Sequence, residues 1–251
     1  MLIHKLGKKP PLTDERTLKM SSYRGTDPII VPADVTWLTK VPANGWPMFM
    51  NDTLGCCVPA AAAHMIEQWT TYAGNPIIPT DADVLKAYED VGGYVPGDPS
   101  TDNGCDMLTM LNYWRTTGVA GHKIFAFVAV NPKNPTEIRE AIYLFGNVFT
   151  GLQLPLSVQG ADTWTVPPGG PSGDGTPGSW GGHCVLTGAD SPMADTCVTW
   201  GQLMSISPEF PPIYVDELFA VLSTEWIEAK GVSPGQFNLA QLEADLQVVT
   251  G

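Results

Sequence analysis

The sequence has no long apolar run and few basic residues. None of its 251 residues belongs to a stretch near the roughly 18–20 apolar residues that a membrane-spanning helix requires, so we expect no membrane partner. Residues 1–11 also lack the apolar segment of a secretory signal, so we do not expect secretion through a signal peptide. Only 13 Lys and Arg oppose 26 Asp and Glu, and an acidic body repels phosphate. The composition therefore argues against nucleic-acid binding.

The few bases are concentrated at the N-terminal end. Residues 1–40 hold seven bases and four acids, whereas the rest of the chain holds six bases and 22 acids. Lys8-Lys9-Pro10-Pro11 and Asp27-Pro28 disfavour regular helix. We therefore predict that residues 1–45 form an extended arm that lies over the body or reaches other protein subunits. A merely solvated arm is the simpler interpretation.

Cysteine chemistry is restricted by number and spacing. The chain has five cysteines, an odd count that disfavours a disulfide framework in a protein without a secretion signal. No CxxC pair occurs, and no two histidines have the spacing of zinc ligands, so we expect neither a structural metal nor a cofactor. The five cysteines are therefore expected to be buried thiols, to include one reactive thiol, or both.

The periodicity predicts a helical part followed by a β-rich part. With 43% hydrophobic residues, the chain can form one sizeable core or two lobes that share an interface. We predict an α+β domain over 46–230, with a helical lobe at about 46–120 and a β-rich lobe at about 121–230, followed by a helical tail over 231–251. Helices are expected at 57–73, from 80, and at 105–117, 135–142 and 238–248; strands at 123–130, 148–154, 184–188 and 196–200; an amphipathic stretch at 214–226; and a long glycine-rich loop at 155–182.

The strongest chemical signal is a thiol at the start of the first helix. Cys57 directly precedes an alanine-rich helix, whose positive N-terminal dipole lowers the pKa of a thiol there. His183, at the start of a strand after the glycine-rich loop, is the natural base for this nucleophile. Two buried cysteines and a hydrogen-bonded core histidine are the alternative.

These residues resemble the motifs of papain-like cysteine peptidases. Asn51 stands six positions before Cys57, Gly55 matches the motif glycine, and Cys56 replaces the usual serine. The second motif resembles the sequence Gly182-His183-Cys184-Val185-Leu186, and the third resembles Val198-Thr199-Trp200-Gly201. The resemblance spans residues 46–222 and implies a papain-like fold and cleavage of peptide or amide bonds. More narrowly, the chain resembles papain-like proteins encoded by actinobacterial phages.

The resemblance also assigns roles. Cys57 is the expected nucleophile, His183 the base and Asn51 the oxyanion donor. Gly55, Cys56, Trp180, Gly182 and Trp200 are expected to support or line the cleft. We expect the Cys57 thiolate to be populated below the ordinary thiol pKa of about 8.5, and Cys56 to face away.

Two positions depart from the family pattern. Asn51 is one methylene shorter than the glutamine of the family. The asparagine that orients the histidine maps to Val198, which has no hydrogen-bonding atom. Asp190, Asp195 and Thr199 are substitutes, although strand alternation places Thr199 on the face opposite residue 198.

Two functions stay open at this stage. One is a cysteine hydrolase acting on a peptide or protein substrate. The other is an inactive papain-like scaffold, such as a structural protein of a phage virion, with the host cytoplasm or the virion as its location.

Of the remaining candidates, His64 fits a core histidine better than a catalytic one. The segment around Cys105 fits a capped helix start better than a calcium loop, because the distal glutamate is missing.

Overall fold

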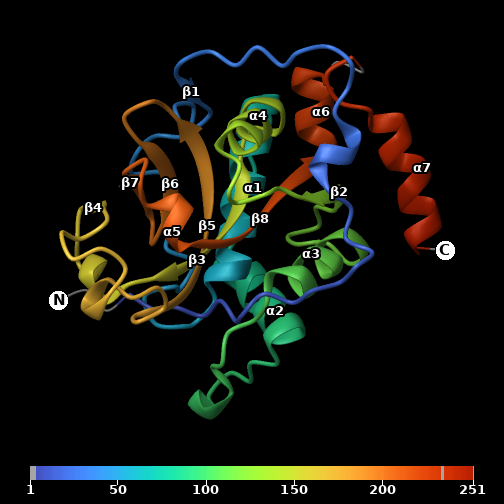
Figure 1. The fold of residues 1–251 in the computed structure, drawn as a ribbon. Coiled ribbons are helices and arrows are strands. Elements are labelled where there is room, and N and C mark those ends of the chain that lie inside the picture. The colour runs from blue at the N-terminus through green and yellow to red at the C-terminus, as the bar shows by residue number, and fades with distance from the viewer. Residues whose placement is uncertain (1–3, 233–234, 251) are drawn as a thin grey trace.

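The computed structural model describes residues 4–232 and 235–250, and it contains an eight-stranded sheet with helices on both faces (Figure 1). The helices are α1 (Cys57–Ala73), α2 (Asp81–Gly92), α3 (Met107–Thr116), α4 (Pro135–Phe145), α5 (Pro211–Tyr214), α6 (Thr224–Lys230) and α7 (Leu239–Thr250), with short 3-10 turns η1 (Met20–Tyr23), η2 (Pro99–Thr101), η3 (Leu156–Val158) and η4 (Gly173–Gly175). The strands are β1 (Val35–Thr36), β2 (Ile124–Ala129), β3 (Val148–Leu154), β4 (Thr163–Trp164), β5 (Gly181–Asp190), β6 (Asp195–Thr199), β7 (Gln202–Ile206) and β8 (Val215–Ser223). This arrangement confirms the predicted α+β class.

The sheet runs in the order β2-β8-β3-β5-β6-β7-β4, and β1 adds to β5. Its pairs are antiparallel except for β4 with β7. In the β5–β6 pair, Leu186 lies opposite Val198 and Thr187 lies opposite Cys197. This register decides which side chains of β6 share a sheet face with His183.

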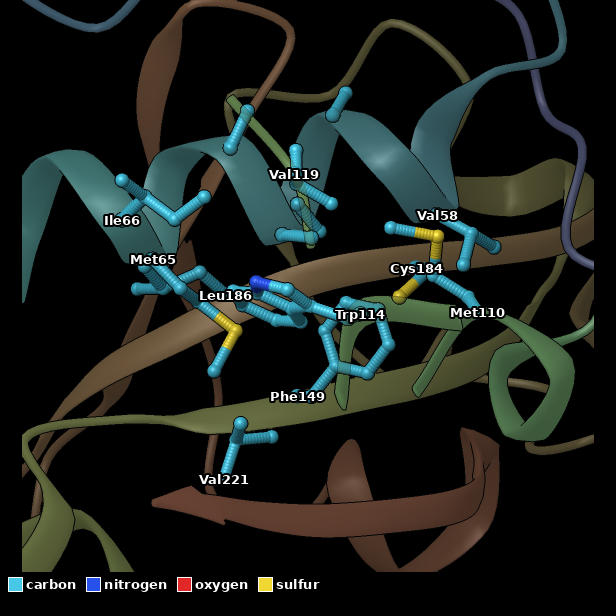
Figure 2. Close-up of a cluster of buried hydrophobic side chains, with 14 of the residues drawn as sticks. Val58, Met65, Ile66, Met110, Trp114, Val119, Phe149, Cys184, Leu186 and Val221 are labelled. Atoms are coloured by element: carbon cyan, nitrogen blue, oxygen red, sulfur yellow. The ribbon is translucent and has the colours of Figure 1, made fainter. Parts of the chain in front are cut away.

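The central helix α1 follows from its local sequence. Pro59 stands in the first turn, where a missing N–H costs no hydrogen bond, and Ala60–Ala63 are strong helix formers. Gly74 ends the helix in the left-handed conformation with φ +87°. Apolar side chains fill the space between α1 and the sheet, among them Met65, Trp114 and Leu186 (Figure 2). The N-terminus of α1 is thereby fixed against β5.

The two helices that follow α1 begin at the expected caps. Thr80 and Asp83 form a capping box at the start of α2. The Asp106 side chain accepts a hydrogen bond from the Thr109 N–H at the start of α3. The segment around Cys105 is thus the entry to a capped helix, the interpretation that the sequence favoured.

A second core lies across the sheet from α1. It joins α4 and the opposite side chains of the central strands, including Phe145, Leu152 and Val185. Residues 4–45 add to both cores: Met20 and Tyr23 pack into the second, and Leu38 packs into the first. The described part of this arm lies on the chain's own body, with β1 as a two-residue strand beside β5.

Two segments differ from the sequence prediction. The 155–182 stretch is not uniformly irregular, because it contains η3, β4 and η4, and β5 already begins at Gly181. The 214–226 stretch divides into the end of α5, strand β8 and the start of α6. Among the described residues, no helix is both long and apolar enough to cross a lipid bilayer.

Candidate active site

Cys57 is the first residue of α1, and its side chain is covered. The residue is 1% exposed. Burial raises the pKa of its thiol to about 11, although the nearby backbone N–H groups of Cys184 and Gly7 and the charge of Lys8 act in the opposite direction. The expectation of an acidic thiol is therefore wrong for this state, because desolvation exceeds the effect of the helix N-terminus. Cys56 faces away as expected, with its Sγ donating to the Phe49 carbonyl oxygen at 3.2 Å.

His183 is the third residue of β5 and is fully buried. Its Nε2 lies 2.7 Å from Thr199 Oγ1, whereas Nδ1 has no hydrogen-bond partner in the described part of the chain. Burial lowers the pKa of His183 to about 3, and the nearby His4 acts in the same direction. Within the described residues no hydrogen bond joins the ring to the Cys57 thiol. Both groups are therefore neutral in this state.

The residue that contacts the His183 ring on β6 is Thr199. Val198, which the motif placed in the orienting position, points to the other face and packs in the core beneath α1. Alternation along the strand was correctly expected to separate residues 198 and 199. Val198 is therefore not the residue that orients the histidine. His183 and Thr199 lie on the same face of the sheet, and Val198 lies on the opposite face.

Aromatic rings enclose the histidine. The Trp200 ring stacks on His183 with centroids 4.4 Å apart, and His4 stacks on Trp200 from the other side at 4.2 Å. Trp180 tilts against Trp200 at 5.7 Å, and Trp164 meets His183 edge-on at 6.2 Å. These rings exclude water from the hydrogen bond between His183 and Thr199.

Asn51 and Gly55 lie in the turn before the helix. Asn51 is buried, and its Nδ2 donates to the Leu54 carbonyl oxygen at 3.0 Å and to the Lys5 carbonyl oxygen at 3.4 Å. The Gly55 N–H donates to Asp102 Oδ1 at 2.9 Å. The side-chain amide of Asn51 therefore faces the peptide carbonyl of Lys5.

That carbonyl belongs to the N-terminal arm, which the sequence did not place at the site. Lys5 donates its N–H to the Asn51 carbonyl oxygen at 3.1 Å, and its own carbonyl oxygen accepts from Trp200 Nε1 at 3.2 Å. Gly7 and Lys8 both donate to the Gly182 carbonyl oxygen, at 3.2 and 3.0 Å.

On the other side of the arm, the Cys105 N–H donates to the Gly7 carbonyl oxygen at 2.9 Å. Three glycines permit this approach: a Cβ on Gly7 would overlap the Gly55 carbonyl oxygen, one on Gly104 the Gly7 carbonyl oxygen, and one on Gly182 the Lys8 carbonyl oxygen. The structure thus gathers Cys57, Asn51, Gly182 and Trp200 around residues 5–8, and His183 adjoins this group through its stacking on Trp200.

The other sequence candidate, His64, lies outside this site. Its ring is buried, with Nε2 2.8 Å from the Pro47 carbonyl oxygen and Phe49 packed against it, so it serves as a core histidine. In the described part of the chain, no group of three or more His, Cys, Asp or Glu side chains is arranged to hold a metal ion.

Comparison with known proteins identifies the fold. The sequence matches no protein-family model and no curated protein. The structure is similar to xylellain, a cysteine protease from Xylella fastidiosa, with 14% identity over 88% of this chain and 97% of that chain, and a TM-score of 0.67. It is also similar to procathepsin B S9 from Trypanosoma congolense (12% identity, 87% and 86% coverage, TM-score 0.61) and procathepsin L 3 from Tenebrio molitor larval midgut (9%, 88% and 77%, 0.60). The chain therefore has the fold of the papain-like cysteine proteases.

Proposed function

We propose that the chain is a papain-like cysteine hydrolase of peptide or amide bonds. Cys57 Sγ attacks the substrate carbonyl carbon while His183 Nδ1 accepts the thiol proton. The oxyanion is held by Asn51 Nδ2 and the Cys57 backbone N–H. His183 then gives the proton to the leaving amine as the C–N bond breaks, and water hydrolyses the thioester to release the acid and restore the thiol.

A single observation carries this proposal: an extended peptide already lies across the candidate site. The arm residues Lys5–Lys9 donate main-chain hydrogen bonds to the carbonyl oxygens of Asn51, Gly182 and Cys105, the Cys105 N–H donates back to Gly7, and Gly7 lies near the Cys57 thiol. Main-chain pairing of this kind accepts an extended segment of varied sequence. A substrate peptide would use the same donors and acceptors once the arm had left.

The arm therefore keeps the enzyme latent in this proposal. Burial keeps both the Cys57 thiol and the His183 ring neutral in this covered state. When the arm leaves, water reaches Cys57 and lowers the pKa of its thiol, and His4 leaves the ring stack on Trp200, so that the His183 ring becomes able to accept the thiol proton. Two of the similar structures are procathepsins, which supports a covered form.

Thr199 takes the positioning role in this scheme. Its hydroxyl holds His183 Nε2 at 2.7 Å and leaves Nδ1, the ring nitrogen without a partner, for the thiol proton. A neutral hydroxyl stabilises an imidazolium less than a carboxylate does, so slower catalysis than in a Cys-His-acid arrangement is expected.

The second candidate is an inactive scaffold, including the phage virion protein that the narrower resemblance implies. The observation that favours it is the tight attachment of the arm. Lys8 is fully buried in ion pairs with Asp216 and Glu217, and β1 is part of the main sheet. An arm that never leaves would make the site inaccessible, and the arm would serve assembly with other subunits.

Turnover by an arm-released variant separates the two candidates. Lys8→Glu places a third carboxylate beside Asp216 and Glu217, so we expect the arm to leave the site. Lys9→Glu is the matched control, because Lys9 is exposed and the charge change is the same. The proposal expects the Lys8→Glu variant to hydrolyse a mixed peptide library, with mass spectrometry as the readout, and Cys57→Ala in that background to abolish turnover. Absence of turnover despite arm release would favour the scaffold.

A further inference from the structure

Next to Cys57 lies a buried acidic pocket that a lysine of the arm fills. The Lys8 side chain is 0% exposed, and its Nζ lies 2.9 Å from Asp216 Oδ2 and 3.1 Å from Glu217 Oε1. The same Nζ donates to the Lys9 carbonyl oxygen at 3.2 Å. A fully buried ammonium group is rare unless it is paired in this way.

A glycine in the wall of the pocket, Gly151, leaves the space that the Lys8 side chain occupies. A Cβ on Gly151 of β3 would overlap the Lys8 side chain and come within 2.7 Å of both Glu217 Cγ and Met107 Sδ. Gln153 Nε2 donates to Asp216 Oδ2 at 2.6 Å, while Asp216 Oδ1 is buried without a hydrogen-bond partner in the described part of the chain. We call the space bounded by Gly151, Met107, Asp216 and Glu217 the Lys8 pocket.

The pocket takes its cation from the arm that crosses the candidate site. Gly7 lies near the Cys57 thiol, and the next residue of the arm sends its side chain into the pocket. Gly7 and Lys8 share the Gly182 carbonyl oxygen as acceptor, so their spacing along the site is set by the main chain. An extended peptide that replaces the arm on these hydrogen-bonding groups places the side chain at the Lys8 position in the same space.

We infer that the Lys8 pocket selects a lysine or arginine side chain of the substrate, at the residue that takes the place of Lys8 on the site. This inference rests on the proposed hydrolase function and adds a substrate class to it. When the arm leaves, Glu217 and Asp216 lose their cation. A basic side chain restores the ion pairs, an apolar one leaves the carboxylates unpaired, and an acidic one repels them. Lys8 is then an internal competitor of the substrate.

The test uses the full chain with the arm displaced. In Gly7→Leu the new side chain overlaps the Gly55 carbonyl oxygen, so the arm cannot dock, and Cys57→Ala in the same protein separates binding from chemistry. Acetylated tripeptide amides of glycine, with lysine, arginine, norleucine or glutamate as the middle residue, are titrated and binding is measured by calorimetry. Lys8→Glu with Cys57→Ala provides a second opened protein, because it displaces the arm by charge rather than by size.

We expect the lysine and arginine peptides to bind about 10- to 100-fold more tightly than the norleucine peptide. The reason is that buried hydrogen bonds to a charged group stabilise a complex by this amount. Glu217→Gln should remove most of this preference, whereas Glu209→Gln, which removes an exposed acid outside the pocket, should preserve it. Equal binding of lysine and norleucine peptides, a preference unchanged by Glu217→Gln, or no binding of any peptide would overturn the inference. A lysine preference without turnover by the Cys57-containing variant would instead overturn the hydrolase function.

Discussion

Displacing the arm should turn Cys57 from the protected state into a reactive thiol. In Gly7→Leu the added side chain overlaps the Gly55 carbonyl oxygen, and that main-chain atom cannot yield as a flexible side chain would. The arm must therefore leave the site, which exposes Cys57 to water and removes the cause of its high pKa.

The size of the effect follows from ionisation. With a pKa of about 11, about one Cys57 thiol in 1,000 is ionised at pH 8, whereas at a pKa of 9.0, near that of an exposed thiol, about one in ten is. Because alkylating reagents react with the thiolate, ionisation alone predicts a rate about 100-fold higher in the variant, and greater access of the reagent adds to this.

The assay is time-resolved alkylation with iodoacetamide at pH 8, followed by mass spectrometry of each cysteine-containing peptide. Gly169→Leu is the matched control, because a Cβ there meets nothing within 4 Å. Cys197, which is fully buried in the second core, is the internal reference. If Cys57 already reacts fastest in the unaltered protein, or if Gly7→Leu leaves its rate unchanged, the account of the covered site is refuted.

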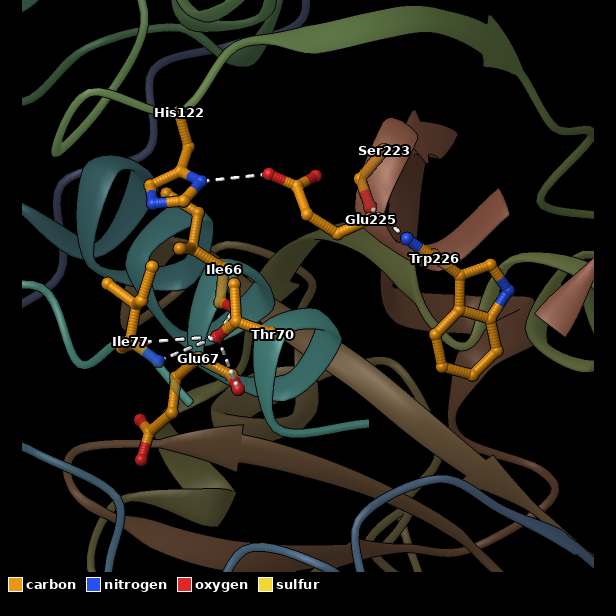
Figure 3. Close-up of polar contacts among 8 residues, drawn as sticks. All are labelled: Ile66, Glu67, Thr70, Ile77, His122, Ser223, Glu225 and Trp226. Atoms are coloured by element: carbon orange, nitrogen blue, oxygen red, sulfur yellow. Dashed lines mark hydrogen bonds and ion pairs between the residues drawn. The ribbon is translucent and has the colours of Figure 1, made fainter. Parts of the chain in front are cut away.

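Substitutions at three further positions test separate parts of the account. Thr199→Val should lower the kcat of the arm-released enzyme by about 10-fold or more, and Thr199→Ser should restore it, because only the hydroxyl holds His183 Nε2; equal activity of the two variants would contradict this role. Val198→Asn should lower the free energy of unfolding by about 1–3 kcal/mol in urea titrations and give no gain in activity, because the amide enters the core beneath α1; a faster enzyme would restore Val198 as the orienting position. Glu67, drawn in Figure 3, has a buried Oε2 without a partner in the described part of the chain, and burial raises its pKa from 4.5 to about 7. The folded state therefore retains a proton that the unfolded state releases, and the free energy of unfolding should fall by about 1–3 kcal/mol between pH 4.5 and 7. Glu67→Gln should flatten this slope while the exposed control Glu243→Gln keeps it, and an unchanged slope in Glu67→Gln would show that the carboxyl is solvated.

Local sequence was sufficient to predict the helix that begins at Cys57 and the strand that contains His183. Pro59 and the alanines after it specify the start of α1, and the strand after His183 is marked by apolar residues. The motif spacing further predicts that Cys57 and His183 act together, which stays a prediction. These signals are local because a helix start and a strand start each depend on a few neighbouring residues.

The partners of the site depended on information that no local pattern contains. The choice of Thr199 over Val198 follows from the β5–β6 register, since residues directly opposite one another point to the same face. With Leu186 opposite Val198, His183 lies on the other face together with Thr199. The sequence pattern alone did not give this register.

The arm left even less of a signal. Its residues 5–9 are held mainly by main-chain hydrogen bonds, and the glycines that admit them come from distant parts of the chain. The Lys8 pocket likewise joins β3, α3 and β8. The sequence predicted an arm that lies over the body or reaches other subunits, without indicating which surface it covers.

The most direct test of the central claim is to trap the covalent intermediate on Cys57. The Lys8→Glu variant is mixed with a peptide p-nitrophenyl ester, quenched in acid within the first turnover, digested and analysed by mass spectrometry. The account predicts one acyl group, attached as a thioester to the peptide that contains Cys57, with release of p-nitrophenol and no adduct in the Cys57→Ala variant. An acyl group on Cys184, or no adduct although the arm has left the site, would contradict it.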